Sequence, residues 1–330
     1  MTLINKNSLI FVAGHNGMVG AAITRCLRNN SYNNLLLPNR KELDLLNYNL
    51  VESWFCKSKP DVVILAAAKV GGIEANNNYP ADFILENLKI QTNIIENSWR
   101  NGIKRFLFLG SSCIYPKLAS QPLKEEFLLN GPLEPTNEPY AIAKIAGIKL
   151  CSALKKQYGF DAISLMPTNL YGPGDNYNLE NSHVLPALIR KFYDAKINNQ
   201  SEVICWGTGS PKREFLYVDD LAEASIFILE KISSDTDPNN HIQLNSDGLI
   251  NIGTGVDITI KNLAELIAEE LNYKGKIKWE TNKPNGTPRK LLDVSQINKL
   301  GWEAKINLKK GIKLTISNFE KEFRNGSIRF

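Results

Sequence analysis

The chain has 330 residues, of which 43% are hydrophobic and 22% are charged, a composition that can bury a full core and excludes a wholly disordered protein. Its net charge of +5 is dispersed along the chain, which argues against a nucleic-acid-binding surface. No apolar run approaches the ~18 residues of a membrane span, no signal peptide is recognisable, and the five cysteines lack CxxC or zinc spacing. We therefore expect a cytoplasmic protein with free thiols, no metal, and no nucleic-acid or membrane partner.

The first half of the chain alternates short apolar runs with helix-like stretches. Strands that are apolar throughout and separated by helices are typical of a parallel sheet covered on both faces. The pattern therefore predicts an α/β fold, a doubly wound parallel sheet of the Rossmann type. The predicted strands are Leu9–Ala13, Leu35–Leu37, 62–68, 106–112 and Ala162–Met166, and the predicted helices are Met18–Leu27 and Ala81–Asn97.

After about residue 170 the sequence becomes rich in Gly, Pro, Asn and Trp, which indicates loops that carry function. Regular patterns return as a helix over Asp219–Lys231, a strand over Ile250–Ile252 and a helix over Thr259–Leu271 that Thr259 would cap. We expect two interleaved domains. Residues 1–170 with segments near 215–255 would form the sheet domain, and residues 171–214 and 256–330 a smaller, mixed α/β domain.

A glycine-rich loop, Gly14-His-Asn-Gly17-Met-Val-Gly20, separates the first predicted strand from the first predicted helix. Glycines at such a turn let backbone amides at a helix N-terminus approach a pyrophosphate, so the loop predicts a bound dinucleotide. The alternative is a glycine-rich turn that binds nothing.

Arg40, which lies 20 positions after Gly20, has no acceptor for a ribose hydroxyl but can pair with a 2′-phosphate, which favours NADP over NAD. A solvated arginine at a strand end is the alternative there.

Tyr140 and Lys144 lie four residues apart in a helix-like stretch, so their side chains project from one face. A lysine charge beside a phenol would lower the phenol pKa, and such a phenol can pass a proton to a carbonyl oxygen. Ser111 ends the fourth predicted strand, at the edge where parallel sheets bind ligands, and its hydroxyl can hydrogen-bond the same oxygen. The three residues together predict carbonyl reduction.

These motifs resemble those of the extended short-chain dehydrogenase/reductase family, and within it most closely the GDP-L-fucose synthases. The resemblance covers nearly the whole chain. It implies an NADPH-dependent epimerase-reductase that converts GDP-4-keto-6-deoxy-D-mannose to GDP-L-fucose, by epimerisation at C3 and C5 and reduction at C4. The segments that carry it are GHNGMVG (14–20), AAAKVGGI (66–73), FLGSSCIYPK (108–117), NEPYAIAKIAGIKLC (137–151), MPTNLYGPGDNY (166–177), GTGSPKREFLYVDDLA (207–222) and GTPRKLLDVS (286–295).

The resemblance also implies roles for individual residues. The pair that would epimerise the sugar matches Cys113 and His183, and thiols and imidazoles as a class can exchange protons near neutral pH; a buried inert cysteine and a structural loop histidine are the alternatives. The nucleotide sugar would contact Lys191, Trp206, Arg213 and Asp293. NADP(H) would contact Gly14, Asn16, Gly17, Met18, Val19, Gly20, Arg40, Asp44, Leu45, Leu109, Gly110, Ser111, Ser112, Tyr140, Lys144, Pro167, Thr168, Asn169, Leu170 and His183.

Asn16 departs from the family, whose members commonly carry arginine there, so we expect a weakened preference for NADP over NAD.

Two other functions stay open. One is a C4 reductase of a related GDP-4-keto sugar, such as a heptose of surface polysaccharides, without epimerase activity; the other is a non-catalytic NADP-binding module. The resemblance further implies a homodimer, for which the apolar face formed by Ile142, Ile145 and Ile148 offers support.

Overall fold

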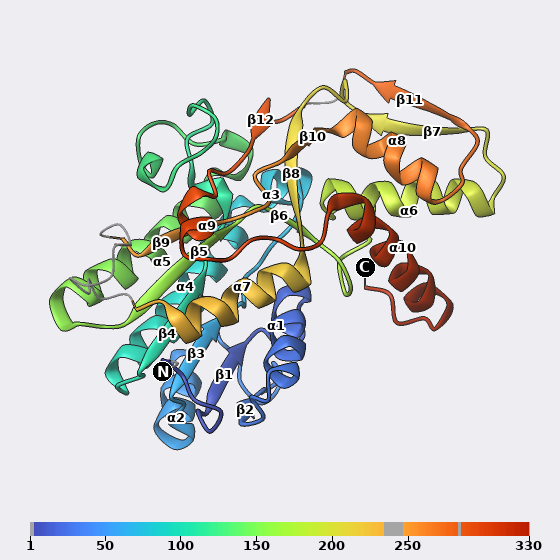
Figure 1. Ribbon diagram of the computed structural model, residues 1–330. Coiled ribbons are helices and arrows are strands. Elements are labelled where there is room, and N and C mark those ends of the chain that lie inside the picture. The colour runs from blue at the N-terminus through green and yellow to red at the C-terminus, as the bar shows by residue number, and fades with distance from the viewer. Residues whose placement is uncertain (1–2, 234–246, 283–284, 330) are drawn as a thin grey trace.

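The computed structural model describes residues 3–233, 247–282 and 285–329 and contains a six-stranded parallel sheet (Figure 1). The strand order is β2-β1-β3-β4-β5-β9, so the chain winds outward in both directions from the position between β1 and β3. The predicted doubly wound α/β fold is confirmed. The strands are β1 (Ile10–Ala13), β2 (Leu35–Leu36), β3 (Val62–Leu65), β4 (Arg105–Leu109), β5 (Ala162–Pro167) and β9 (Leu249–Ile252).

Helices cover both faces of this sheet (Figure 1). One face packs against α1 (Met18–Asn29) and α7 (Val218–Lys231), and the other against α2 (Tyr48–Ser58), α4 (Pro80–Arg100) and α5 (Glu138–Tyr158). Both faces are therefore shielded from water, which explains why most residues of these strands are apolar.

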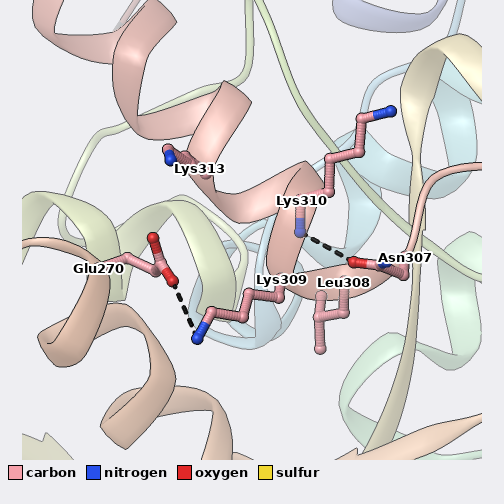
Figure 2. Close-up of a pocket in the computed structure, with 6 residues that line it drawn as sticks. All are labelled: Glu270, Asn307, Leu308, Lys309, Lys310 and Lys313. Atoms are coloured by element: carbon pink, nitrogen blue, oxygen red, sulfur yellow. Dashed lines mark hydrogen bonds and ion pairs between the residues drawn. The ribbon is translucent and has the colours of Figure 1, made fainter.

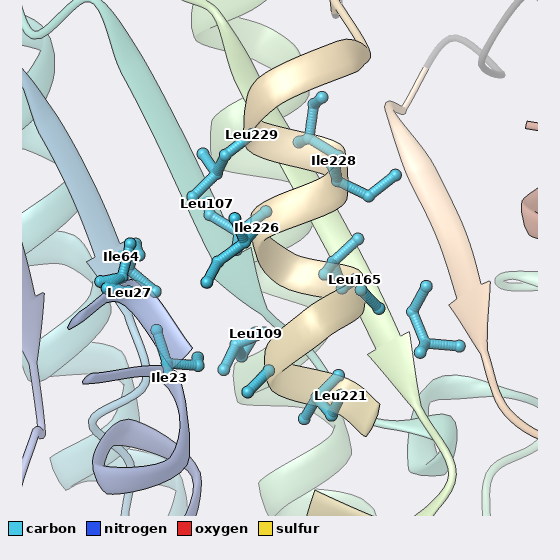
Figure 3. Close-up of a cluster of buried hydrophobic side chains, with 14 of the residues drawn as sticks. Ile23, Leu27, Ile64, Leu107, Leu109, Leu165, Leu221, Ile226, Ile228 and Leu229 are labelled. Atoms are coloured by element: carbon cyan, nitrogen blue, oxygen red, sulfur yellow. The ribbon is translucent and has the colours of Figure 1, made fainter. Parts of the chain in front are cut away.

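The alternation of side chains along β4 shows how one strand serves both cores. Leu107 and Leu109 pack in the same cluster as Leu221 and Ile226 of α7 (Figure 3). Phe106 and Phe108 belong to the cluster on the opposite face, with the apolar residues of α4 and α5. Because successive side chains of a strand point to opposite faces, one apolar run fills two cores.

A smaller unit stands beyond the carboxyl ends of these strands, in the upper right of Figure 1. Its strand β8 pairs antiparallel with β10 and parallel with β12 and β6, and β11 pairs with β7. Its core contains Phe192, Ile267 and Phe319. The elements are β6 (Asn169–Tyr171), α6 (Val184–Ile197), β7 (Glu202–Trp206), β8 (Lys212–Tyr217), β10 (Asp257–Thr259), α8 (Ile260–Glu270), β11 (Lys276–Glu280), β12 (Arg289–Lys290) and α10 (Leu308–Arg324).

Shorter helical segments connect these elements. They are α3 (Ile73–Asn78), α9 (Ser295–Lys299) and 3₁₀ turns at Ser112–Ile114, Glu125–Phe127 and Pro135–Asn137. Across the described residues, none of the helices combines the length and the apolar composition needed to cross a bilayer.

Most of the predicted elements are present, with shifted ends. The runs 62–68 and 106–112 are strand only as far as Leu65 and Leu109, because the chain then turns over the edge of the sheet. Thr259 does cap α8, since its hydroxyl accepts from the N–H of Asn262 at 3.1 Å. The division into two domains stays a prediction, and residues 234–246 of its returning segment lie outside the described residues.

The expected apolar dimer face of α5 is wrong for two of its three residues. Ile145 is 8% exposed and Ile148 is fully buried, and both belong to the core between α5 and the sheet. Ile142 is 43% exposed. The periodicity of this helix therefore reports packing on its own sheet more than contact with a second chain.

Candidate active site

The glycine loop folds tightly over the start of α1. Gly14 has φ +89°, a conformation that favours glycine, and a Cβ at Gly20 would lie 2.2 Å from the carbonyl oxygen of Gly14. Gly17 is the N-cap of α1 and supplies no side-chain acceptor to the first turn. The first amides of α1 can therefore point at an anionic ligand, and the loop fits the pyrophosphate of a dinucleotide.

The other residues predicted to contact the dinucleotide lie at the same edge of the sheet. The segments 109–112 and 167–170 come at the carboxyl ends of β4 and β5, and are tied together where the N–H of Gly110 donates to the carbonyl of Leu165 at 2.9 Å. Arg40 and Asn16 are both exposed. Asp44 and Leu45 stabilise the turn after β2, where they accept from the Leu46 amide and the Asn93 side chain.

Ser111, Tyr140 and Lys144 come together at the end of β4. The Ser111 side chain forms a hydrogen bond with the Tyr140 phenol. Lys144 is only 4% exposed; its Nζ donates to the carbonyl oxygen of Leu109 at 2.8 Å and lies 5.9 Å from the centre of the Tyr140 ring. Burial lowers the pKa of Lys144 to about 8.

The acid–base balance of Tyr140 differs from the sequence expectation. Burial raises the pKa of its phenol, the nearby Cys113 adds to this, and the hydrogen bond with Ser111 acts in the opposite direction. Besides burial, Cys113 and Ser111 shift the pKa of the phenol and Lys144 does not, while burial lowers the pKa of the Lys144 ammonium itself. At neutral pH the phenol is protonated, which is the form that can donate a proton to a carbonyl oxygen.

Cys113 lies beside this group, in the 3₁₀ turn after β4. Its Sγ accepts from Nδ2 of Asn137 at 3.3 Å and from Nζ of Lys290 at 3.5 Å. Arg213 is close enough to interact with the thiol. Burial lowers the pKa of its guanidinium, and the sulfur of Cys113 acts in the opposite direction. The cysteine therefore sits between the Ser111–Tyr140–Lys144 group and a set of cationic side chains.

His183 is connected to the same cations. It forms the N-cap position of α6, and its side chain remains accessible to solvent. Desolvation of the imidazole lowers its pKa, and the Lys290 ammonium lowers it further. The imidazole is therefore neutral at pH 7 and can accept a proton. Lys290 interacts with both Cys113 and His183, so it links the two residues that sequence analysis paired.

Asn137 and Lys290 contact Cys113 but were not among the residues predicted from the sequence. Asn137 lies three residues before Tyr140, at the start of the motif NEPYAIAKIAGIKLC, and Lys290 lies in the motif GTPRKLLDVS. The register of β12 on β8 places Lys290 opposite Arg213. Two cationic residues on paired strands would have indicated Lys290, but the pairing of β12 with β8 cannot be read from the sequence alone.

The residues predicted to bind the nucleotide sugar fall into separate places. Lys191 donates to the carbonyl of Ile204 at 3.0 Å, and its Nζ lies 5.3 Å from the ring centre of Trp206, which is 46% exposed. Asp293 lies in the segment after β12. Its carboxylate accepts from the Ser295 amide at 2.9 Å, and although burial raises its pKa, the hydrogen bonds with Ser295 lower it on balance.

A cavity of about 680 Å³ opens elsewhere, between α8 and the start of α10 (Figure 2). Lys309 is paired there with Glu269 and Glu270, at 3.0 and 3.5 Å. None of the predicted site residues lines it, so it is a surface hollow away from the candidate active site. Its lining residues are Glu270, Asn307, Leu308, Lys309, Lys310 and Lys313.

A doubly wound sheet with a glycine-rich first turn, and a Ser–Tyr–Lys group at its ligand-binding edge, defines the class of NAD(P)-dependent oxidoreductases of the short-chain type. The sequence model of the NAD dependent epimerase/dehydratase family matches residues 10–245. The chain belongs to this family.

Individual relatives cover almost the whole chain. It is 57% identical over 313 residues to a putative GDP-L-fucose synthase 2 of Arabidopsis thaliana, which covers 95% of this chain and 92% of the relative. It is 53% identical over 310 residues to the GDP-L-fucose synthase of Escherichia coli K12, with 94% and 96% covered. Among solved structures, a GDP-mannoheptose C4 reductase from Campylobacter jejuni with NADP bound superposes with a TM-score of 0.86 at 39% identity, covering 96% of this chain and 99% of that one.

Proposed function

We propose that this protein is an NADPH-dependent epimerase-reductase that converts GDP-4-keto-6-deoxy-D-mannose to GDP-L-fucose. Its similarity over nearly full length to GDP-L-fucose synthases supports this function. One observation carries the proposal: the thiol of Cys113 lies next to the reductase group and accepts from Lys290, which also interacts with His183. A reductase alone needs no second pair of proton carriers.

NADPH supplies the hydride for the reduction. The amides at the start of α1, beyond Gly17, would hold its pyrophosphate, and Lys144 has two N–H bonds beyond the one to Leu109 that can donate to the nucleotide. Arg40 is exposed and would meet the 2′-phosphate without help from Asn16. Michaelis constants for NADPH and NADH test this preference, and a lower constant for NADH would contradict it.

The epimerisations need proton carriers on two sides of the sugar. The ketone at C4 acidifies the hydrogens at C3 and C5, so one group removes a proton from one face while another delivers a proton to the opposite face. Cys113 and His183 are suited to these roles because one carries a thiol beside an ammonium and the other a neutral imidazole. The Lys290 ammonium stabilises negative charge that develops on the sulfur.

The reduction uses the group at the end of β4. The Tyr140 hydroxyl is protonated and gives its proton to the C4 oxygen, while the Ser111 hydroxyl, already in contact with the phenol, hydrogen-bonds the same oxygen. Lys144 is fixed by Leu109 and supplies positive charge behind the phenol as the proton leaves. Arg213 and Lys191 would neutralise the diphosphate, and Trp206 would contact a ring.

A C4 reductase of a related GDP-4-keto sugar is the second candidate, because a GDP-mannoheptose C4 reductase shares this fold at 39% identity. In that function Cys113 and His183 would be present but unused. Incubation with the 4-keto hexose in deuterated water before NADPH is added separates the two functions. Deuterium at C3 and C5 supports the epimerase-reductase, and its absence, with reduction intact, supports the reductase.

We also propose that the protein acts as a cytoplasmic homodimer that supplies a sugar nucleotide for surface polysaccharide. Leu85 of α4 and Ile142 of α5 are 53% and 43% exposed on two helices that pack together, and α4–α5 pairs of two copies can form a four-helix interface. The mass measured by light scattering tests the dimer. A monomer at micromolar concentration would contradict it.

A further inference from the structure

Glu214 is a fully buried carboxylate that the proposed chemistry does not use. Its Oε1 accepts from the backbone N–H groups of Thr254 and Gly255, at 2.6 and 2.8 Å. Its Oε2 accepts from the N–H of Leu292 at 2.9 Å. Both oxygens thus bind amides from segments far away in the sequence, and such charge-assisted bonds are among the stronger ones in a protein interior.

The segments that Glu214 joins carry or border predicted site residues. It directly follows Arg213 on β8, and Leu292 lies two residues after Lys290. The main-chain carbonyl of Glu214 makes a different connection: it accepts from Oγ1 of Thr168 at 3.1 Å and from Nδ2 of Asn169 at 2.8 Å. The carboxylate therefore binds the turn at Thr254 and Gly255 and the segment that follows Lys290. The carbonyl binds two residues that are predicted to contact the dinucleotide.

The space around the carboxylate is shaped to receive it. A Cβ on Gly253, the residue that follows β9, would lie 2.2 Å from Oε1 of Glu214. No side chain fits there without displacing the carboxylate, because the contact is far closer than van der Waals distance. The turn 253–255 therefore wraps around the carboxylate and places two amides on one oxygen.

We propose that the carboxylate of Glu214 is a positioning residue that fixes Arg213 and Lys290 relative to the hydride-transfer edge of the sheet. This inference rests on the proposed function for its kinetic consequences. Glu214 lies within β8, and its carboxylate accepts from the N–H of Leu292, two residues after the end of β12. When an amide replaces the carboxylate, one of the two acceptor oxygens becomes an NH2 group, so either Leu292 or the pair Thr254 and Gly255 loses its acceptor and the contact of β8 with these segments weakens.

Asp220 provides a matched control within the same chain. It is also a buried carboxylate, 2% exposed, and its Oδ2 accepts two backbone amides, from Lys305 and Ile306, at 3.2 and 2.9 Å. It lies on α7 and contacts none of the predicted site residues through these bonds. Asp220→Asn therefore reports the generic loss of stability when a buried carboxylate becomes an amide.

The test compares Glu214→Gln with Asp220→Asn in the full-length protein. We expect Glu214→Gln to raise the Michaelis constant for the GDP-4-keto sugar at least tenfold, while the dissociation constant for NADPH, measured by fluorescence, changes less than twofold. Amide hydrogen exchange in 253–256 and 286–295 should increase at least tenfold in Glu214→Gln and stay unchanged in Asp220→Asn. Glu214→Asp, which keeps the charge but shortens the reach, should give a smaller change of the same kind.

Three results would overturn the proposal. They are unchanged exchange in both segments, an unchanged Michaelis constant despite faster exchange, or an NADPH affinity that falls as much as the sugar affinity. If Glu214→Gln does not fold, Glu214→Asp is compared with Asp220→Asn instead, and no change in exchange or in the Michaelis constant for the sugar would overturn the proposal. Absence of turnover in the unmodified protein would reject the proposed function instead, and the exchange measurement would still decide whether Glu214 holds the two segments.

Discussion

The groups assigned to reduction and to epimerisation share one edge of the sheet but are built in different ways. Ser111, Tyr140 and Lys144 come from β4 and α5, which pack directly on each other, and Lys144 is fixed by a main-chain carbonyl. The thiol of Cys113 is instead contacted by Lys290, 177 residues away in the sequence. The first group is therefore as rigid as the sheet, whereas the second depends on how the smaller unit sits over it.

The largest expected effect tests the rigid group. Tyr140→Phe removes the hydroxyl that donates to the C4 oxygen, so turnover with NADPH should fall about 10³-fold, equivalent to about 4 kcal/mol. NADPH binding should stay within twofold, because the ring is retained. Reduction within tenfold of the unmodified rate would show that another group supplies the proton.

The next effect separates the two groups. Cys113→Ser replaces the thiol with a hydroxyl of much lower acidity, and deuterium incorporation at C3 and C5 should slow at least 10²-fold, or about 3 kcal/mol. Reduction of a ketone that is already epimerised should fall less than fivefold, because Tyr140 and Ser111 remain. Equal losses in both assays would mean that the two groups act as one.

Lys144→Met tests the energetic cost of the rigid group. Burial lowers the pKa of Lys144 in the folded protein to about 8, from an ordinary 10.5. The cost in folding stability of burying the ammonium is therefore complete below pH 8 and disappears as the pH rises to about 10.5. The shift corresponds to about 3 kcal/mol, and loss of the bond to Leu109 offsets about 1 kcal/mol. The variant should be about 2 kcal/mol more stable at pH 7.

Urea unfolding at pH 7 and at pH 9.5 measures this difference. The stability advantage of Lys144→Met should shrink at the higher pH, because the lysine of the folded wild-type protein is then neutral. A variant that is less stable than the wild type at pH 7 would contradict the assignment of a strained buried ammonium.

The smallest expected effect concerns the distant lysine. Lys290→Met removes the ammonium that donates to Cys113, and deuterium incorporation should slow about tenfold, or about 1.4 kcal/mol. Lys290→Arg should recover part of the rate, and reduction should change less than twofold. A drop in reduction equal to the drop in exchange would place Lys290 in the rigid group instead.

The same contrast explains what could be predicted from sequence. The sheet, the glycine loop and the Tyr140–Lys144 spacing depend on residues close in the chain or on a strong apolar pattern, and these were predictable. The contact of Lys290 with Cys113 depends on the register of β12 against β8, which no local pattern encodes. α10 is absent from the predicted elements, because Gly311 and Thr315 interrupt its apolar face where they pack inside.

One prediction failed for an electrostatic reason. The acidification of Tyr140 by Lys144 was inferred from spacing alone, which does not show that burial acts on both groups. The role of Asp293 in substrate binding, which the resemblance of its motif implies, stays a prediction; its carboxylate accepts from the Ser295 amide. Spacing predicts which face a side chain takes, while its charge state and its partner follow from the complete environment.

The position of β9 has a consequence for how the chain is made. β5 pairs on its outer side with β9, Leu249–Ile252, and the chain forms β6, α6, β7, β8 and α7 between the two strands. During synthesis, the outer edge of β5 therefore stays unpaired until β9 has left the ribosome. An apolar strand with a free edge is a site for unwanted association, so nascent chains halted before residue 249 should be the species that most need a chaperone.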